Sequence, residues 1–402
     1  MLCQIMKAII INIHHQYTLC QLAIHLIMHR SGHGNDKGTL IRKQALHMGH
    51  RKIGDGSTPL QRLLKPAHGA HLFRGCTLLP CCGPKQAPIP VEKSHGDNAG
   101  ISPLDQLHLI QPFPRNFMTL YRTELEKYLK ETYNADVTVV DGKNDQTEQT
   151  NQINSFIAEG VDVLIVNLVQ STSAATVIDL VEAAGIPTVF INREPSEEDM
   201  EKWTDKIAYV GADARQSGTF QGEIVAATEN KGDFNGNGTV DYVMIMGDPE
   251  NVDAQYRTEY SIKALNDAGI TTNKLFEQRG DWLQENGQQL AATALAQFGQ
   301  DVDVIFCNND AMALGAYQAI VDAGRVVNED IYLLGVDALA ECVEMVANGT
   351  MTGTVLNDHI GQSHTAADVA IQAANGEEMN AYYWVDYVKV TAENAAEFMT
   401  AE

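Results

Sequence analysis

Short apolar segments alternate with amphipathic helical segments from residue 116 to about residue 374, and this alternation constrains the fold more than any other feature of the chain. Strands that are apolar along their whole length are typical of parallel sheets covered by helices on both faces. The predicted strands cover residues 137–140, 163–166, 187–191, 208–210, 242–246, 274–277, 304–307 and 332–336. The predicted helices cover residues 116–133, 146–158, 174–184, 216–228, 257–268, 286–298, 312–323, 340–347 and 361–374.

The length of this alternating region predicts more than one core. Single hydrophobic cores stop growing at about 250–300 residues, and the chain of 402 residues has a long α/β stretch in addition to its N-terminal part. We therefore expect an α/β fold with two doubly wound parallel-sheet lobes. Ligands of such sheets bind beyond the carboxyl ends of the strands, so functional residues are expected directly after each strand.

Residues 1–115 differ from the remainder in composition. They hold 13 basic and 5 acidic residues, whereas residues 116–402 hold 15 basic and 47 acidic ones. Apolar residues in this first part follow no sustained helical or strand period, and prolines interrupt it repeatedly. We interpret residues 1–115 as a basic, poorly structured leader, either disordered or a wrongly assigned gene start.

The residues that follow the predicted strands are polar and rich in amides. They offer no nucleophile, but they combine acceptors, donors and the fixed fork of an arginine, which suits a ligand covered with hydroxyl groups. Sugars are such ligands, and the flat faces of a sugar ring pack on aromatic rings. The alternative is that each amide or carboxylate only caps the next helix. The candidate polar residues are Asn167, Asp253, Arg257, Asn309 and Asp337, and the candidate rings are Phe117 and Trp282.

Several ordered motifs between residue 116 and about residue 398 closely resemble the galactose/glucose-binding proteins of bacterial ABC transport systems. The motifs are Asn167-Leu168-Val169, Phe190-Ile191-Asn192-Arg193-Glu194-Pro195, Tyr209-Val210-Gly211, Asn308-Asn309-Asp310-Ala311-Met312-Ala313, Gly335-Val336-Asp337-Ala338-Leu339 and Gly353-Thr354-Val355-Leu356-Asn357-Asp358.

The resemblance implies a type I periplasmic binding protein, in which a three-segment hinge joins two lobes that close over one hexose. It implies a first lobe of residues 116–190 plus 359–384 and a second lobe of residues 191–358 plus 385–402. It also implies that D-galactose or D-glucose is bound and delivered to an ABC permease, with a chemoreceptor as a further partner. The implied ligand-binding residues are Phe117, Asn167, Asn251, Asp253, Arg257, Trp282, Asn309, Asp337 and Asn357.

The chain departs from the family pattern at two positions of the site. Asn251 stands where the family has His, and Arg115 stands where the family has an Asp that accepts a hydrogen bond from the sugar. Because Arg115 is the last residue of the leader, we expect residues 1–115 to have replaced the export signal and the first strand of the family.

A second constellation resembles the calcium loop of an EF-hand. Oxygen-bearing side chains stand at loop positions 1, 3, 5 and 9, Gly stands at position 6, and position 7 supplies a carbonyl. The usual acid at position 12 is absent, and the alternative is a plain Gly/Asn-rich turn. The family has such a loop without flanking helices, completed by a distant acid. The implied ligands of a structural Ca²⁺ are Asp233, Asn235, Asn237, Thr239, Asp241 and Asp303.

Other classes of function find little support in the sequence. No dinucleotide, phosphate-loop or nucleophile-elbow motif occurs in residues 116–402, which argues against an enzyme. The net charge of −24 argues against nucleic acid as a partner, and no apolar run is long enough to span a membrane. The sugar-sensing core of a transcription regulator remains as the alternative function. The family implies a periplasmic or extracellular-face location, and Cys307 and Cys342 are expected to be buried thiols.

Overall fold

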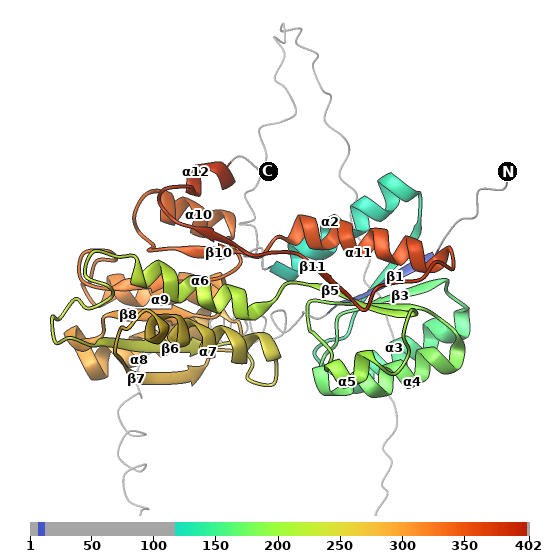
Figure 1. Ribbon diagram of the computed structural model, residues 1–402, viewed down its shortest axis with the longest axis horizontal. Helices are drawn as coiled ribbons and strands as arrows, with labels where there is room; N and C mark the ends of the chain where they lie inside the picture. Colours follow the sequence, from blue (N-terminus) through green and yellow to red (C-terminus); the bar gives the residue numbers. More distant parts are fainter. Residues whose placement is uncertain (1–6, 13–116, 400–402) are drawn as a thin grey trace, which may run out of the picture. The chain divides into compact units, whose positions relative to one another are not determined.

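The structure is a computed structural model that describes residues 7–12 and 117–399. All of these residues belong to one compact unit of the chain. Arg115 is among residues 13–116, which lie outside the described residues. Two separate sheets confirm the predicted pair of α/β lobes (Figure 1).

The first lobe contains a six-stranded parallel sheet in the order β11-β5-β4-β3-β1-β2. Helices α2 and α11 lie over one face, and helices α3 and α4 lie over the other (Figure 1). The strands are β1 (Lys7–Asn12), β2 (Asp136–Asp141), β3 (Val163–Val166), β4 (Thr188–Ile191), β5 (Ile207–Gly211) and β11 (Tyr382–Trp384). The helices are α2 (Phe117–Tyr133), α3 (Gln146–Glu159), α4 (Ala174–Ala184), α5 (Glu197–Met200) and α11 (His359–Ala374), with a 3₁₀ turn at Ser171–Ser173.

Strand β3 shows why the apolar runs had no alternation. Val163 and Ile165 pack with α2 and α11 in one cluster, whereas Leu164 and Val166 pack with α3 and α4 in another. Successive side chains of a strand point to opposite faces, so a strand covered on both sides must be apolar at every position.

The second lobe contains a four-stranded parallel sheet in the order β7-β6-β8-β9 and an antiparallel pair of β10 with β12. Its strands are β6 (Val240–Met246), β7 (Thr272–Arg279), β8 (Val304–Cys307), β9 (Tyr332–Leu334), β10 (Thr354–Leu356) and β12 (Val388–Val390). Its helices are α6 (Ala214–Ala226), α7 (Val252–Asp267), α8 (Gln284–Phe298), α9 (Asp310–Asp322), α10 (Ala340–Ala347) and α12 (Ala395–Phe398), with a 3₁₀ turn at Gly299–Asp301.

Three connections join the two lobes, as the three-segment hinge predicted. They run from β5 to α6 through residues 212–213, from β10 to α11 through residues 357–358, and from β11 to β12 through residues 385–387. The N–H of Val385 donates to the carbonyl of Gly211 at 2.9 Å, so a hydrogen bond ties the third connection to the end of β5, directly before the first connection.

Two predictions from the sequence need correction, one on the first strand and one on a lobe boundary. The expectation that the leader replaced the first strand is wrong, because Lys7–Asn12 forms β1 between β2 and β3. The boundary after residue 190 is also wrong, because β5 pairs with β4 and extends the first lobe to Gly211. Both errors have one cause. Which strands pair in a sheet cannot be read from their separation along the chain or from local composition.

Cys307 and Cys342 are both buried and carry free thiols, as expected. Among the helices between residues 117 and 399, none combines the length and apolar character that a bilayer crossing requires.

Strand β1 yields a first prediction. Replacing Ile10 by Pro removes a backbone N–H from a strand paired on both sides, and a partner carbonyl loses its donor. We expect Ile10→Pro to lower the free energy of unfolding by about 1–3 kcal/mol in urea denaturation. Ile10→Val keeps the N–H and serves as the control. Equal unfolding midpoints for wild type and Ile10→Pro would contradict the position of β1.

Candidate functional site

One pocket collects residues from both lobes at the carboxyl ends of their strands. It encloses about 650 Å³, including the space at its open mouth. All nine residues predicted to bind ligand line it, although their part in binding stays a prediction. The lining residues are Phe117, Met118, Asn167, Asn192, Arg193, Asn251, Asp253, Arg257, Trp282, Asn309, Asp337 and Asn357.

Two of the amides serve as helix caps and pocket residues at once. The Oδ1 atom of Asn251 accepts the N–H of Asp253 at 3.0 Å at the start of α7. The Oδ1 atom of Asn309 accepts the N–H of Met312 at 3.0 Å at the start of α9. The capping alternative is therefore correct for these residues, but it does not compete with a role in the pocket.

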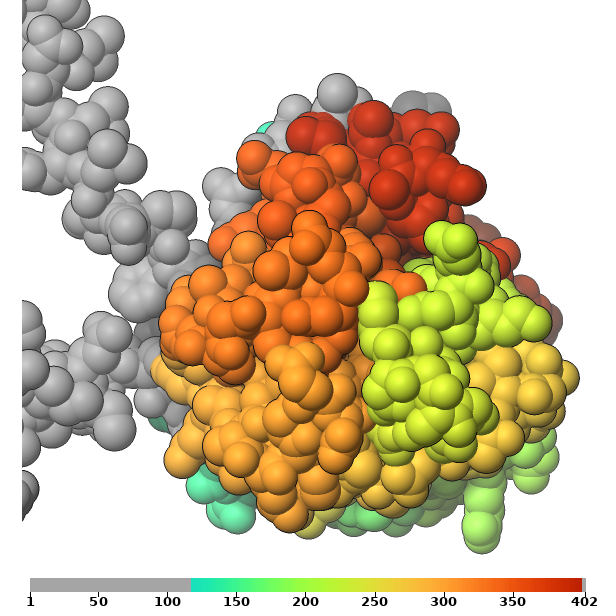
Figure 2. Space-filling view, turned by 90° about the vertical axis from the view of Figure 1, so that its left-hand side faces the viewer, coloured from blue at the N-terminus to red at the C-terminus, as the bar shows by residue number. Residues whose placement is uncertain are grey.

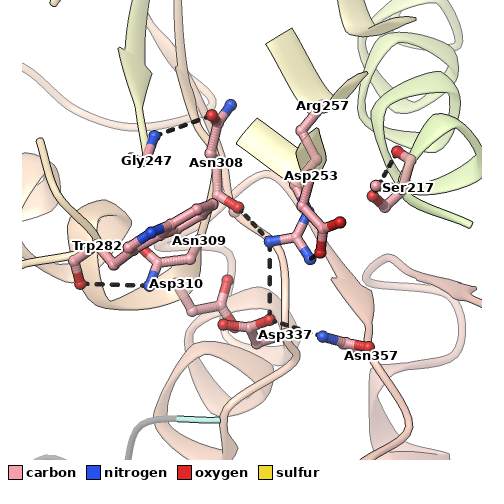
Figure 3. Close-up of polar contacts among 12 residues, drawn as sticks. Ser217, Gly247, Asp253, Arg257, Trp282, Asn308, Asn309, Asp310, Asp337 and Asn357 are labelled. Atoms are coloured by element: carbon pink, nitrogen blue, oxygen red, sulfur yellow. Dashed lines mark hydrogen bonds and ion pairs between the residues drawn. The ribbon is translucent and has the colours of Figure 1, made fainter. Parts of the chain in front are cut away.

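Arg257 is an arginine that the second lobe contributes to the pocket, and the residue is 3% exposed. Its Nη1 atom donates to the carbonyl of Asn308 at 2.7 Å and lies 4.0 Å from the Asp337 carboxylate (Figure 3). Its Nη2 atom lies 3.7 Å from the carboxylate of Asp253, one helical turn earlier on α7. Its buried Nε–H has no hydrogen-bond partner among the described residues. Such a donor is costly to leave empty, so the guanidinium is arranged to receive a further acceptor.

The two carboxylates beside Arg257 are more basic than ordinary ones. Burial raises the pKa of Asp337 to about 7, although Arg257 opposes the change. Burial also raises the pKa of Asp253, against the opposing charges of Arg257 and Arg193. Both acids and the guanidinium beside them are desolvated, so keeping the acids charged costs free energy. Hydrogen-bond donors from a ligand would reduce this cost.

A short chain of side-chain contacts connects Asp337 to the first lobe. The Nδ2 atom of Asn357 donates to Asp337 at 3.3 Å (Figure 3), and the Oδ1 atom of Asn357 accepts from Gln362 at 2.6 Å. Gln362 belongs to α11, which packs on the first sheet. Asn357 therefore bridges the lobes at the second connection.

The two predicted rings are held by different means. Phe117 begins α2 and meets Tyr121 edge to face at 5.8 Å between ring centroids. Trp282 follows β7, and a Cβ atom on Gly247 would lie 2.2 Å from its indole, so only glycine at residue 247 leaves room for the ring. The guanidinium of Arg257 lies 5.7 Å from the same ring, within the range of a cation–π contact.

Three residues of the pocket have a positive φ angle. Asn192, Trp282 and Asp337 have φ angles of 61°, 66° and 122°, in regions that side-chain-bearing residues rarely occupy. Such residues persist only where surrounding contacts enforce them, and they cluster at functional sites.

Three lining residues were missed by the sequence analysis. Asn192 and Arg193 directly follow β4, and the strand-end rule could have found them. The guanidinium of Arg193 donates to the carbonyl of Val169 and is 8% exposed. Met118 follows Phe117 and carried no polar signal. Arg115 lies outside the described residues.

The loop of residues 233–241 is hydrogen-bonded to Asp303, the distant acid that was predicted as a calcium ligand; the calcium site itself stays a prediction. Asp303 accepts the N–H groups of Phe234 at 3.0 Å and Asp241 at 2.9 Å. In Figure 2 the yellow-green surface, which includes α6 and the loop after it, adjoins the orange surface of the later part of the second lobe. The amide nitrogen of Asn235 lies 3.1 Å from Asp241 and 3.3 Å from Asp303.

The donor set of this loop fits a hard cation. One amide nitrogen stands between two carboxylates, and burial together with Asp241 raises the pKa of Asp303, although backbone N–H groups oppose the change. In residues 117–399 no three His, Cys, Asp or Glu side chains converge on one point. Asp233 instead accepts the N–H of Gly236 at 2.7 Å. A cation would thus rely on amide and carbonyl oxygens beside the two carboxylates, which are ligands that Ca²⁺ accepts.

Comparisons with known proteins agree with this geometry. Residues 109–378 match the family described as periplasmic binding protein domain. The D-galactose/methyl-galactoside binding periplasmic protein MglB of Haemophilus influenzae is 31% identical over 72% of this chain and 90% of its own length. A putative rhizopine-binding protein of Rhizobium meliloti is 33% identical over 71% of this chain and 89% of its own.

A solved structure shows the same fold. It is an ABC transporter solute binding protein from Bacillus halodurans with bound myo-inositol, with a TM-score of 0.63 and 29% identity, covering 71% of this chain and 93% of its own. The family match, the identity to these relatives and the likeness of fold agree, and the chain belongs to the type I periplasmic binding proteins, the sugar-binding proteins of ABC transport systems.

Proposed function

We propose that this protein binds a hexose, D-galactose or D-glucose, between its lobes and delivers it to an ABC permease in the periplasm or on the outer face of the membrane. The observation that carries the proposal is the pocket itself, in which all nine predicted residues meet. The relative of Haemophilus influenzae whose name states galactose binding supports the choice of ligand.

Each group of the pocket has a chemical task in this function. Asp253 and Asp337 accept sugar hydroxyls, Arg257 donates to ring or hydroxyl oxygens, and the amides of Asn167, Asn309 and Asn357 do both. Phe117 and Trp282 would pack against the two faces of the ring. The residues come from both lobes, so a bound sugar favours the closed arrangement by its differential affinity. The permease, and as a second partner a chemoreceptor, would then recognise the closed form.

A cyclitol is the second candidate ligand. It also presents a ring covered with hydroxyl groups, and a solved structure 29% identical to this chain holds myo-inositol. The polar groups of the pocket do not by themselves separate the two ligand classes, so a direct comparison of affinities must decide.

Calorimetric titration with D-galactose, D-glucose, myo-inositol and D-ribose tests the proposal. We expect the tightest binding for a hexose. Asp253→Asn should weaken that binding about 10- to 100-fold, because a charged acceptor in a buried site is lost. Asp267→Asn, on the exposed end of the same helix α7, is the matched control. Tightest binding of myo-inositol or ribose would overturn the hexose assignment, and no binding of any would overturn the function.

The raised pKa of Asp337 predicts a pH dependence of binding. The pKa of Asp337 is about 7 in the folded protein and 3.8 ordinarily, so between these values the folded state holds a proton that the unfolded state has lost. The free energy of unfolding therefore decreases as pH rises from about 4 to 7. Sugar hydroxyls that donate to the carboxylate favour its charged form. We therefore expect affinity to rise between pH 6 and pH 8 with release of a proton.

Calorimetry in buffers of different ionisation enthalpy measures this proton. Asp337→Asn should bind more weakly and lose most of the pH dependence, whereas Asp253→Asn should retain it. Proton uptake on binding, or a wild-type affinity that is constant from pH 6 to pH 8, would contradict the assigned role of Asp337.

We also propose that the loop of residues 233–241 holds a structural Ca²⁺ with Asp303. Free Ca²⁺ at 100 times its dissociation constant would stabilise the fold by about 2.7 kcal/mol. Removing it with a chelator should therefore lower the melting temperature by about 5–10 °C. Asp241→Asn should abolish the calcium effect, and Asp301→Asn, an exposed neighbour of Asp303, should not. A melting temperature indifferent to chelator and to added Ca²⁺ would refute the site.

A further inference from the structure

Tyr387 lies in the third connection between the lobes and is 4% exposed. Its backbone N–H donates to the Oε1 atom of Gln216 at 2.7 Å. Gln216 is in the first turn of α6, directly after the first connection. The position of Tyr387 is therefore fixed from the second lobe on one side and by the chain entering from β11 on the other.

The hydroxyl of Tyr387 contacts the pocket residue Arg257. The Nη2 atom of Arg257 donates to it at 3.0 Å, and the guanidinium lies 5.9 Å from the centroid of the tyrosine ring. Burial raises the pKa of Tyr387 to about 12, although Arg257 opposes the change, so the hydroxyl is neutral near pH 7. Tyr387 itself does not line the pocket.

The contact determines how Arg257 faces the pocket. The guanidinium is planar and rigid, so fixing two of its corners fixes the third. One corner donates to the carbonyl of Asn308 beyond β8, and the second donates to Tyr387. The remaining Nε–H is the buried donor for which the described part of the chain supplies no partner. Its direction is thus set jointly by the second sheet and by the third connection.

We propose that Tyr387 is a positioning residue that couples the sugar pocket to the hinge through Arg257. The inference rests on the proposed function of the pocket. Tyr387 packs in the core of the second lobe and is the last residue of the third connection. A rotation of one lobe against the other is absorbed by the connecting segments, so it acts on the backbone directly before Tyr387 and, through its hydroxyl, on the guanidinium. Coupling is reciprocal: a ligand that holds Arg257 in one orientation favours the hinge conformation that supports this orientation.

The test compares two substitutions that each remove one buried hydroxyl. Tyr387→Phe removes the acceptor of Arg257 and keeps the ring. Tyr332→Phe is the matched control, since Tyr332 is 7% exposed, lies in the same lobe and loses a 2.8 Å hydrogen bond to Asn230 that is remote from the pocket. Thermal unfolding first establishes that both variants are folded.

The first readout needs no sugar. The side-chain Nε–H resonance of Arg257, assigned by its loss in Arg257→Lys, should shift and exchange faster with solvent in Tyr387→Phe and stay unchanged in Tyr332→Phe. The second readout is calorimetric affinity for the tightest hexose together with lobe closure followed by paired spin labels. We expect about tenfold weaker binding and less complete closure in Tyr387→Phe, and less than twofold change in Tyr332→Phe.

A double-mutant cycle separates positioning from general destabilisation. Lysine has no planar fork, so in an Arg257→Lys background Tyr387→Phe should weaken binding by less than twofold. An unchanged Arg257 resonance in Tyr387→Phe, unchanged affinity, or the same tenfold loss in the Arg257→Lys background would each overturn the inference. A shifted resonance in a protein that binds none of the sugars would uphold the positioning of Arg257, and would overturn the coupling and the proposed function.

Discussion

Coverage of both faces of each parallel sheet is the constraint from which the rest of this structure follows. Strands such as β3 and β8 are buried at every position, so none of their side chains can meet a ligand. Only the carboxyl ends, where the chain turns from strand to helix, offer polar groups to a common space. Most of the pocket residues are therefore found on turns and first helical turns, with Arg257 in the second turn of α7, and the sheets serve to bring these segments together.

Within the pocket the dominant interaction is that of one buried guanidinium with two buried carboxylates. Arg257 lies 3.7 Å from Asp253 and 4.0 Å from Asp337, both longer than a direct hydrogen bond, and burial holds both acids above their usual pKa values. A fully paired site would be stable without ligand. This one keeps an unpartnered donor and two costly charges, so a ligand with many hydroxyl groups completes a network that the protein alone leaves open.

The same network also extends to the connections between the lobes. Asn357 lies in the second connection and contacts Asp337, and Tyr387 lies in the third and contacts Arg257. Ligand groups that hold these acids and this arginine therefore act on segments that must change when the lobes move. A pocket built on rigid sheet ends but joined to flexible connections allows binding and closure to influence each other.

The sequence by itself determined the α/β winding, the two lobes and the nine residues that meet in the pocket, because hydrophobic period, strand ends and ordered motifs are local properties. It did not determine that Lys7–Asn12 pairs between β2 and β3, or that β5 belongs to the first sheet. Nor did it reveal Arg193 in the pocket or Tyr387 behind Arg257. Those facts depend on which distant segments pair and pack, and only the tertiary structure decides that, because strand pairing and buried contacts leave no periodic signal along the chain.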